Sequence, residues 1–401
     1  MQDVSFDSLT IVLGIAFVVP LLLACVPRLR VPGVVVEIVL GIVVGPQVLD
    51  WARVDSAVAV LSVIGLAFLL FLCGLEVDLD RLRGRVLSLA ALSFGLSLVL
   101  ALGVGLVLDV AGLVRSPLLA AVILTATSLG LVLPTLQEDG RSTTSFGQLV
   151  FAGATLGNLL SALLLSLLFS RDSTDVGTKV VLLGGFALTV LVLVVALTRH
   201  RMSMPLSKLL TRLQDTTAQI RVRGAMFLLV LLVLAAQEFG VAAVLGAFIA
   251  GAVVSVVDRD GVRTHPQLRV KLDAVGYGFV IPVFMVAAGL TFDLDALLDQ
   301  PSVLLRVPVF LLALLVVRGL PALVFRPVLG TRRAVAAGFL LATSLPFIVA
   351  ASEIGQSLGV VTRGTAAAFV TAGLVSALVF PMTAAALVRR DERELTAVPD
   401  R

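Results

Sequence analysis

Long apolar stretches separated by short polar segments run along almost the whole chain. About 13 of these stretches are long enough to cross a bilayer, because a helix needs roughly 20 apolar residues to do so. They lie near 7–26, 32–50, 55–76, 86–108, 116–137, 146–169, 178–198, 220–236, 239–257, 270–291, 302–325, 333–354 and 363–388. This pattern predicts an all-α polytopic membrane protein surrounded by the lipid bilayer.

Composition supports this class of protein. Of the 401 residues, 59% are hydrophobic and only 14% are charged, and the mean hydropathy is +1.11. The two histidines lie in polar segments, and the two cysteines lie within or at the end of apolar spans, so neither residue type has the spacing of a metal site. We therefore expect no metal, no cofactor and no enzymatic activity.

Basic residues are distributed unevenly among the polar segments. If the N-terminus is outside, most of the 30 lysines and arginines fall in inner loops and in the C-terminal tail. Cytoplasmic loops of membrane proteins carry such an excess. The bias predicts a multi-pass protein of the inner (plasma) membrane with its N-terminus outside and its C-terminus in the cytoplasm. The net charge of +4 is then explained by the basic residues of the cytoplasmic loops. We therefore expect no nucleic-acid partner.

A nine-residue phrase occurs twice in the chain. GLEVDLDRL begins at Gly74 and GLTFDLDAL begins at Gly289, so that Glu76 corresponds to Thr291. The copies end predicted spans that are seven spans apart, and an odd separation gives them opposite directions in the membrane. Three further short matches have a similar separation. The sequence therefore predicts an inverted repeat, which is typical of secondary transporters working by alternating access.

The repeat suggests a division of the chain into five parts. We expect an N-terminal transmembrane helix, a first five-helix repeat, linker helices with a basic cytoplasmic loop, a second inverted repeat and a cytoplasmic tail. Their residue ranges are 1–31, 32–170, 171–238, 239–390 and 391–401.

The tetrapeptide ATSL occurs once in each repeat, beginning at Ala126 and at Ala342. The rise of about 1.5 Å per residue puts both copies near the middle of the bilayer. Gly130 and Pro134 follow the first copy and Pro346 follows the second. Proline has no backbone N–H, so a carbonyl one turn earlier loses its hydrogen bond within the helix. In a membrane such a carbonyl is costly unless it lines a cavity or binds an ion.

We therefore expect two discontinuous helices, broken between positions 125 and 134 and between positions 343 and 346. The hydroxyl residues of the two copies are candidate ion ligands: Thr127, Ser128, Thr343 and Ser344. The alternative is a pair of proline-kinked helices whose hydroxyl groups bond to their own carbonyls.

Five longer phrases have the content and order of a known transporter family. They are VPGVVVEIVLGIVVGP from Val31, LLFLCGLEVDLDRLR from Leu69, AAVLGAFIAGAVVS from Ala242, IPVFMVAAGLTFDL from Ile281 and LPFIVAASEIG from Leu345. Together they resemble the monovalent cation/proton antiporter superfamily, in the branch of bacterial sodium/proton exchangers and potassium-efflux antiporters. The resemblance implies that the discontinuous helices cross, that the protein is a homodimer, and that it exchanges Na⁺ or K⁺ for protons.

One position departs from the pattern of this family. Its members carry a midplane Asp in the span after the first crossing helix, and that Asp binds the cation or the proton. The matching positions here are Gly157 and Asn158. An amide oxygen can bind a cation, but an amide cannot exchange a proton. Asn158 is thus either an ion ligand or a hydrogen-bonding contact between helices. The chain is either an antiporter or an uncoupled cation or solute transporter or sensor.

Three other ionisable residues fall inside predicted spans, in the half nearer the cytoplasm: Glu37, Glu76 and Arg318. A charge at the centre of a membrane costs at least roughly 2.5 kcal/mol, so such groups usually pair or face a cavity. We expect Arg318 to form an ion pair with Glu76 or Glu37, and the alternative is that it belongs to a substrate site. Any proton coupling would then have to come from one of the two glutamates.

Overall fold

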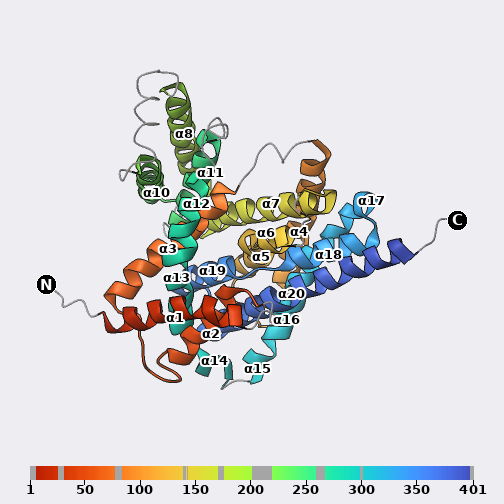
Figure 1. The fold of residues 1–401 in the computed structure, drawn as a ribbon, viewed down its shortest axis with the longest axis horizontal. Coiled ribbons are helices and arrows are strands. Elements are labelled where there is room, and N and C mark those ends of the chain that lie inside the picture. The colour runs from red at the N-terminus through yellow and green to blue at the C-terminus, as the bar shows by residue number, and fades with distance from the viewer. Residues whose placement is uncertain are drawn as a thin grey trace. The chain divides into compact units, whose positions relative to one another are not determined.

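The computed structural model describes residues 6–25, 31–76, 84–138, 141, 143–169, 176–200, 219–258, 267–298 and 301–397. Within these ranges every regular element is a helix, and no strand is present (Figure 1). The predicted all-α class is therefore confirmed.

Each predicted apolar segment coincides with one helix or with a series of consecutive helices. In chain order they are α1 (Asp7–Cys25), α2 (Gly33–Val44), α3 (Ser56–Leu75), α4 (Gly84–Val110), α5 (Pro117–Thr125), α6 (Leu129–Glu138), α7 (Ser145–Leu168), α8 (Val176–His200), α10 (Ile220–Glu238), α11 (Ala243–Asp258), α12 (Gln267–Val275), η2 (Gly276–Val280), α13 (Ile281–Leu290), α14 (Leu294–Leu298), α15 (Pro301–Leu304), α16 (Arg306–Leu314), η3 (Leu315–Gly319), η4 (Pro321–Phe325), α17 (Arg326–Leu329), α18 (Thr331–Ala342), α19 (Pro346–Ser357) and α20 (Arg363–Ala397).

Eight helical stretches in the described part of the chain are long and apolar enough to cross a membrane, and the bent pair of α18 and α19 makes a ninth. Four shorter apolar helices, which include α2 and α11, fall below this length. The expected polytopic character is thus supported by length and composition, while the number of about 13 spans stays a prediction.

Contacts divide the chain into two compact units. Unit 1 comprises Met1–Asp55, Leu79–Ser161 and Met285–Arg401, and unit 2 comprises Ser56–Asp78 and Ala162–Phe284. Each unit therefore contains segments from both halves of the sequence. The two predicted repeats and their boundaries remain a prediction.

In unit 2, glycines allow α3 and α11 to touch at backbone distance. A Cβ atom on Gly74 would lie 1.9 Å from the carbonyl oxygen of Phe248, and one on Gly251 would lie 1.9 Å from the carbonyl oxygen of Phe71. No side chain fits at such distances, so glycine is required on both helices.

In unit 1, α2 and α13 form a similar contact. A Cβ atom on Gly41 would lie 2.3 Å from the carbonyl oxygen of Val286, and one on Gly289 would lie 2.2 Å from the carbonyl oxygen of Ile38. Gly74 and Gly289 are the first residues of the two copies of the repeated phrase. Each copy thus begins at a glycine that a close helix contact requires.

Both ATSL segments interrupt a helix. The first break covers Ala126–Ser128, between α5 and α6, and the second covers Thr343–Leu345, between α18 and α19. The pair of α18 and α19 is bent by 40°. Both expected breaks are confirmed. The first break ends before Pro134, because α6 continues through that position.

The apolar core of unit 1 surrounds these breaks. Its buried side chains come from α6, α7, η4, α18 and α20, and they include Leu129, Phe151, Phe325, Leu340 and Val388. This core packs two of the four half-helices, α6 and α18, against α7, η4 and α20. Such packing keeps irregular backbone away from lipid, where its unpaired groups would be costly.

Candidate functional site

The two helix breaks lie against each other. The backbone N–H of Ser128 donates to the carbonyl oxygen of Thr343 at 2.8 Å, and the hydroxyl of Thr127 donates to the carbonyl oxygen of Leu341 at 2.6 Å. The expected crossing of two discontinuous helices is therefore present. At this crossing α5 and α18 end, with partial negative charge on their last carbonyls, while α6 and α19 begin, with partial positive charge.

Arg318 reaches the crossing from a turn of π-helix, η3, and only 1% of the residue is exposed. Its Nε and Nη2 atoms donate to Thr127 Oγ1 at 3.0 and 2.8 Å. Nη2 also donates to the carbonyl oxygen of Gly153 at 3.0 Å, and Nη1 donates to Ser97 Oγ at 3.3 Å. The Thr127 hydroxyl donates one hydrogen bond and accepts two, so its capacity is fully used.

The expected ion pair between Arg318 and a glutamate is wrong. In the described part of the chain the guanidinium bonds to neutral oxygens, and Glu76 instead pairs with Arg269 of α12 at 3.3 Å. The C-terminal ends of α5 and α18, which carry partial negative charge, lie beside Thr127. They take the place of the glutamate that was expected to compensate the positive charge of Arg318. Glu37 is 6% exposed, and its Oε2 atom has no hydrogen-bond partner among the described residues.

One face of α7 packs against the crossing. A Cβ atom on Gly157 would lie 2.6 Å from Arg318 Nη2 and 3.2 Å from Thr127 Oγ1. Four residues on, Ser161 Oγ lies 3.0 Å from Thr125 Oγ1. Residues spaced by four share one face of a helix. Glycine at position 157 is therefore explained by the guanidinium and the hydroxyl that lie against it.

Asn158 lies about 100° further round α7 than Gly157, because a helix turns by that angle at each residue. Asn158 is buried, with 7% exposure. The interpretation of Asn158 as a hydrogen-bonding contact between helices stays a prediction. Its role as an ion ligand remains a proposal.

The four hydroxyl residues of the breaks are all buried, but they are used differently. Thr127 is saturated, Ser128 contributes its backbone N–H, and Thr343 Oγ1 donates back to the carbonyl of Phe339 at 3.1 Å. Ser344 Oγ has no partner among the described residues, although the Ser344 backbone exchanges hydrogen bonds with Ser376 Oγ at 3.3 and 3.0 Å. Of the four, Ser344 is the one with a fully buried hydroxyl oxygen that has no hydrogen-bond partner in the described part of the chain.

Sequence reasoning missed several polar residues of this centre. Ser97 on α4 bonds to Arg318, and Ser376 on α20 holds the second break. Thr155 on α7 is buried without a hydrogen-bond partner among the described residues. A single hydroxyl in an apolar span carries no signal by itself. For Thr155, however, the spacing of three residues before Asn158 was visible in the sequence.

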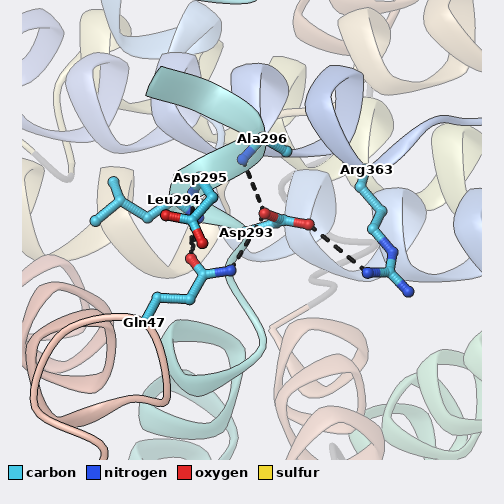
Figure 2. A network of polar contacts seen from close by, with 6 residues as sticks. All are labelled: Gln47, Asp293, Leu294, Asp295, Ala296 and Arg363. Carbon is cyan, nitrogen blue, oxygen red and sulfur yellow. Dashed lines mark hydrogen bonds and ion pairs between the residues drawn. The ribbon is translucent and has the colours of Figure 1, made fainter. Parts of the chain in front are cut away.

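A second polar network lies elsewhere in unit 1 (Figure 2). Asp293 Oδ1 accepts a hydrogen bond from the backbone of Ala296 at 2.9 Å and one from Gln47 Nε2 at 3.2 Å, and Oδ2 lies 3.9 Å from Arg363 Nη1. Gln47 Oε1 accepts from the backbone N–H of Leu294. Asp293, in the second copy of the repeated phrase, therefore caps α14 and connects the residues after α2 to the start of α20. The corresponding Asp78 lies outside the described residues.

An all-α membrane fold with two broken helices crossing at a buried polar centre is typical of secondary transporters. The family described as sodium/hydrogen exchanger, transmembrane, matches residues 13–390, and the chain belongs to this family.

Similar proteins agree with this assignment. The chain is 31% identical over 98% of its length to the putative Na⁺/H⁺ antiporter YjbQ of Bacillus subtilis, and it spans 65% of that protein. It is 28% identical over 93% of its length to the probable Na⁺/H⁺ antiporter 3 of Methanocaldococcus jannaschii and spans 94% of it. In fold it resembles the sodium proton antiporter MjNhaP1 of the same organism, with a TM-score of 0.63, 16% identity, and coverage of 96% of this chain and 99% of that one.

Proposed function

We propose that this protein is a secondary transporter that exchanges Na⁺ or K⁺ for protons by alternating access. The observation that carries the proposal is the crossing of two broken helices at Thr127 and Thr343, in a chain of the sodium/hydrogen exchanger family. Broken helices present partial charges to an ion at the midplane without placing a full charge in the membrane.

The setting of the transporter follows the sequence prediction. We place it as a homodimer in the plasma membrane, with the N-terminus outside and the C-terminus in the cytoplasm, because basic residues concentrate in the loops predicted to be inside. The two halves of the chain would interchange inward-open and outward-open shapes as an inverted repeat.

Proton coupling in this chain requires a group other than Asn158. Glu37 is our candidate, because it is buried in α2 and has no ion pair among the described residues. Glu76 is a weaker candidate, since Arg269 stabilises its charged form. A proton and a cation that compete through Glu37 would give coupled exchange.

The amide at position 158 supports a second candidate function. Without a carboxylate on α7, the protein would carry a cation or another solute without protons, or act as a sensor. Ser145–Leu168 contains no acidic residue at all, which is the specific observation in favour of this alternative.

Transport in proteoliposomes with an internal pH dye separates the two functions. We expect pulses of NaCl, KCl or LiCl to change the internal pH, compared with choline chloride pulses and protein-free vesicles. Uptake of labelled cation with constant internal pH would select the uncoupled function. No movement of any of the three cations would contradict both transport functions.

Two glutamate variants test where the proton binds. Glu37→Gln should abolish cation-driven pH change, whereas Glu76→Gln, the matched change at an ion-paired glutamate, should retain it. The reverse result would move proton coupling to Glu76.

A third variant tests the amide. Under the uncoupled function, native transport should depend only weakly on pH between about pH 6 and 8. Under either function, Asn158→Asp should add a pH dependence, because a carboxylate can bind a proton and an amide cannot. The sign follows from competition: the apparent cation affinity of Asn158→Asp should fall as the pH falls. An unchanged pH profile would show that position 158 does not meet the ion.

A further inference from the structure

The chain contains a single tryptophan, Trp51, which lies in the loop after α2. This residue is 64% exposed, and three aliphatic residues of the same loop are exposed as well: Val48, Leu49 and Val54. Exposed apolar side chains that gather in one place mark a surface that another molecule covers. The loop of residues 45–54 therefore presents an apolar surface to an occupant outside the chain.

Hydrogen bonds hold this loop in one shape. The backbone N–H of Trp51 donates to the carbonyl oxygen of Val44 at 3.0 Å, and the backbone N–H of Asp50 donates to that of Gly45 at 2.8 Å. Arg53 donates two parallel hydrogen bonds to the Asp50 carboxylate, at 2.8 and 2.7 Å. Such bidentate pairs have a specific geometry. The exposed side chains are thus carried by an ordered loop, in which one positive and one negative charge compensate each other.

Helix α1 fixes the level of the loop in the membrane. It is a candidate span of 19 residues, and at about 1.5 Å per residue its length is close to the thickness of the hydrocarbon core. Its first turn therefore lies at a membrane surface. The hydroxyl of Ser8, in this turn, accepts a hydrogen bond from the backbone N–H of Arg53 at 3.2 Å. The loop consequently lies at the same level, where the hydrocarbon meets the lipid headgroups.

A second exposed aromatic side chain lies at this level. Phe6 directly precedes α1 and is 64% exposed. Its position is fixed, because the backbone N–H and the hydroxyl of Thr10 both donate to the Phe6 carbonyl oxygen at 2.8 Å. Tryptophan is enriched at membrane interfaces, where its ring is apolar and its N–H meets a polar partner. Phenylalanine and leucine enter the same region from interfacial segments.

We propose that the loop of residues 45–54, together with Phe6, anchors this end of unit 1 in the headgroup region of the phospholipid bilayer, with Trp51 as its main contact. Phospholipid fits this surface better than a second copy of the chain does. The charges of Arg53 and Asp50 are already paired, and most of the neighbouring helix α1 is exposed, as expected of a helix that faces lipid.

The anchor is also connected to the second copy of the repeated phrase. Gln47, in the same loop, donates to Asp293 at 3.2 Å and accepts from the backbone at the start of α14 (Figure 2). The loop would therefore hold the start of α14 at the level of the interface, along with the end of α2.

Fluorescence of the native protein tests the proposal, because Trp51 is its only tryptophan. The protein is placed in phosphatidylcholine vesicles whose acyl chains are brominated either near the headgroup or near the methyl end. Interfacial side chains lie roughly 5–10 Å into the boundary between headgroups and acyl chains, so bromine near the headgroup should quench the emission at least about twofold more strongly.

Three results would overturn the proposal. Quenching by aqueous iodide but by neither lipid would place Trp51 in water. Stronger quenching by bromine near the methyl end would place it in the hydrocarbon core. No quenching by either lipid or by iodide would show that a second copy of the chain, or another protein, covers the loop.

Phe17→Trp in a Trp51→Phe background is the matched control, because Phe17 lies on α1 and is 70% exposed. Ten residues after Asp7, this position is about 15 Å deep. Its tryptophan should be quenched more strongly by bromine near the methyl end, the reverse of the native result. The same order of quenching in both proteins would contradict the level assigned to the first turn of α1, and with it the anchor.

Discussion

The two ATSL segments have the same four residues and both break a helix, yet their threonines have different partners. Thr127 donates across the crossing to Leu341 and accepts two hydrogen bonds from Arg318. Thr343 donates only to Phe339 in its own helix. The first threonine therefore joins three segments of the chain, whereas the second satisfies itself locally.

This difference comes from the neighbours of each break. Arg318 is delivered to the first break by η3, and Gly157 leaves room for it. At the second break, Ser376 binds the backbone of Ser344 and leaves the Ser344 hydroxyl unpartnered among the described residues. A repeated sequence thus fixes where the backbone is irregular, and the surrounding helices decide which of its polar groups remain available.

The largest expected effect is that of Arg318→Ala. It leaves a cavity and removes the donors for Thr127, Ser97 and the Gly153 carbonyl, so the free energy of unfolding should fall by about 3 kcal/mol. Arg318→Met preserves most of the volume and should lose about half as much. Denaturant unfolding in detergent measures both. Equal losses would show that packing is unimportant and that the polar contacts dominate.

Thr127→Val and Thr343→Val test the comparison directly with the same isosteric change. Thr127→Val should lower the free energy of unfolding by about 2 kcal/mol, because it removes the hydrogen bond to the Leu341 carbonyl and two of the four hydrogen bonds that the buried guanidinium donates. Thr343→Val should cost less than about 1 kcal/mol, since its bond is local. Thermal unfolding midpoints would rank the two. Similar losses for both threonines would remove the proposed asymmetry.

Gly157→Ala tests the space beside Arg318. The added methyl group would lie 2.6 Å from Nη2, so the guanidinium must shift, and we expect a loss of about 1 to 2 kcal/mol. Gly95→Ala on α4 is the control, because no heavy atom lies within 4 Å of a Cβ atom at that position. In the Arg318→Ala background the cost of Gly157→Ala should largely disappear. If the losses of Gly157→Ala and Arg318→Ala simply add in the double variant, the added methyl group does not clash with Arg318.

The smallest expected effect is that of Ser344→Ala. A buried hydroxyl without a partner adds nothing to stability, so the free energy of unfolding should change by less than about 0.5 kcal/mol. A loss as large as that of Thr127→Val would mean that Ser344 has a partner in the folded protein. Cation-dependent protection measured on the same variant would report any role in binding.

Several parts of the site were predictable from the sequence because they depend on local chemistry. The apolar segments mark the helices, the ATSL segments mark both breaks, and the repeated glycines of the nine-residue phrase mark close helix contacts. Other parts were not predictable. Arg318 was expected to pair with a glutamate, but hydroxyl groups and carbonyl oxygens bind it instead.

The sequence by itself determined the membrane class, the family resemblance and the positions where helix hydrogen bonding stops. These properties depend on the length of apolar segments and on breaks in the backbone, and both are set by residues that follow one another in the chain. Only the tertiary structure decided which polar groups meet. It paired Glu76 with Arg269, used the full hydrogen-bonding capacity of the Thr127 hydroxyl, and left the Thr155 hydroxyl without a partner among the described residues. The physical reason is that a hydrogen bond acts only over about 3 Å, and residues far apart in the chain reach that distance only through packing.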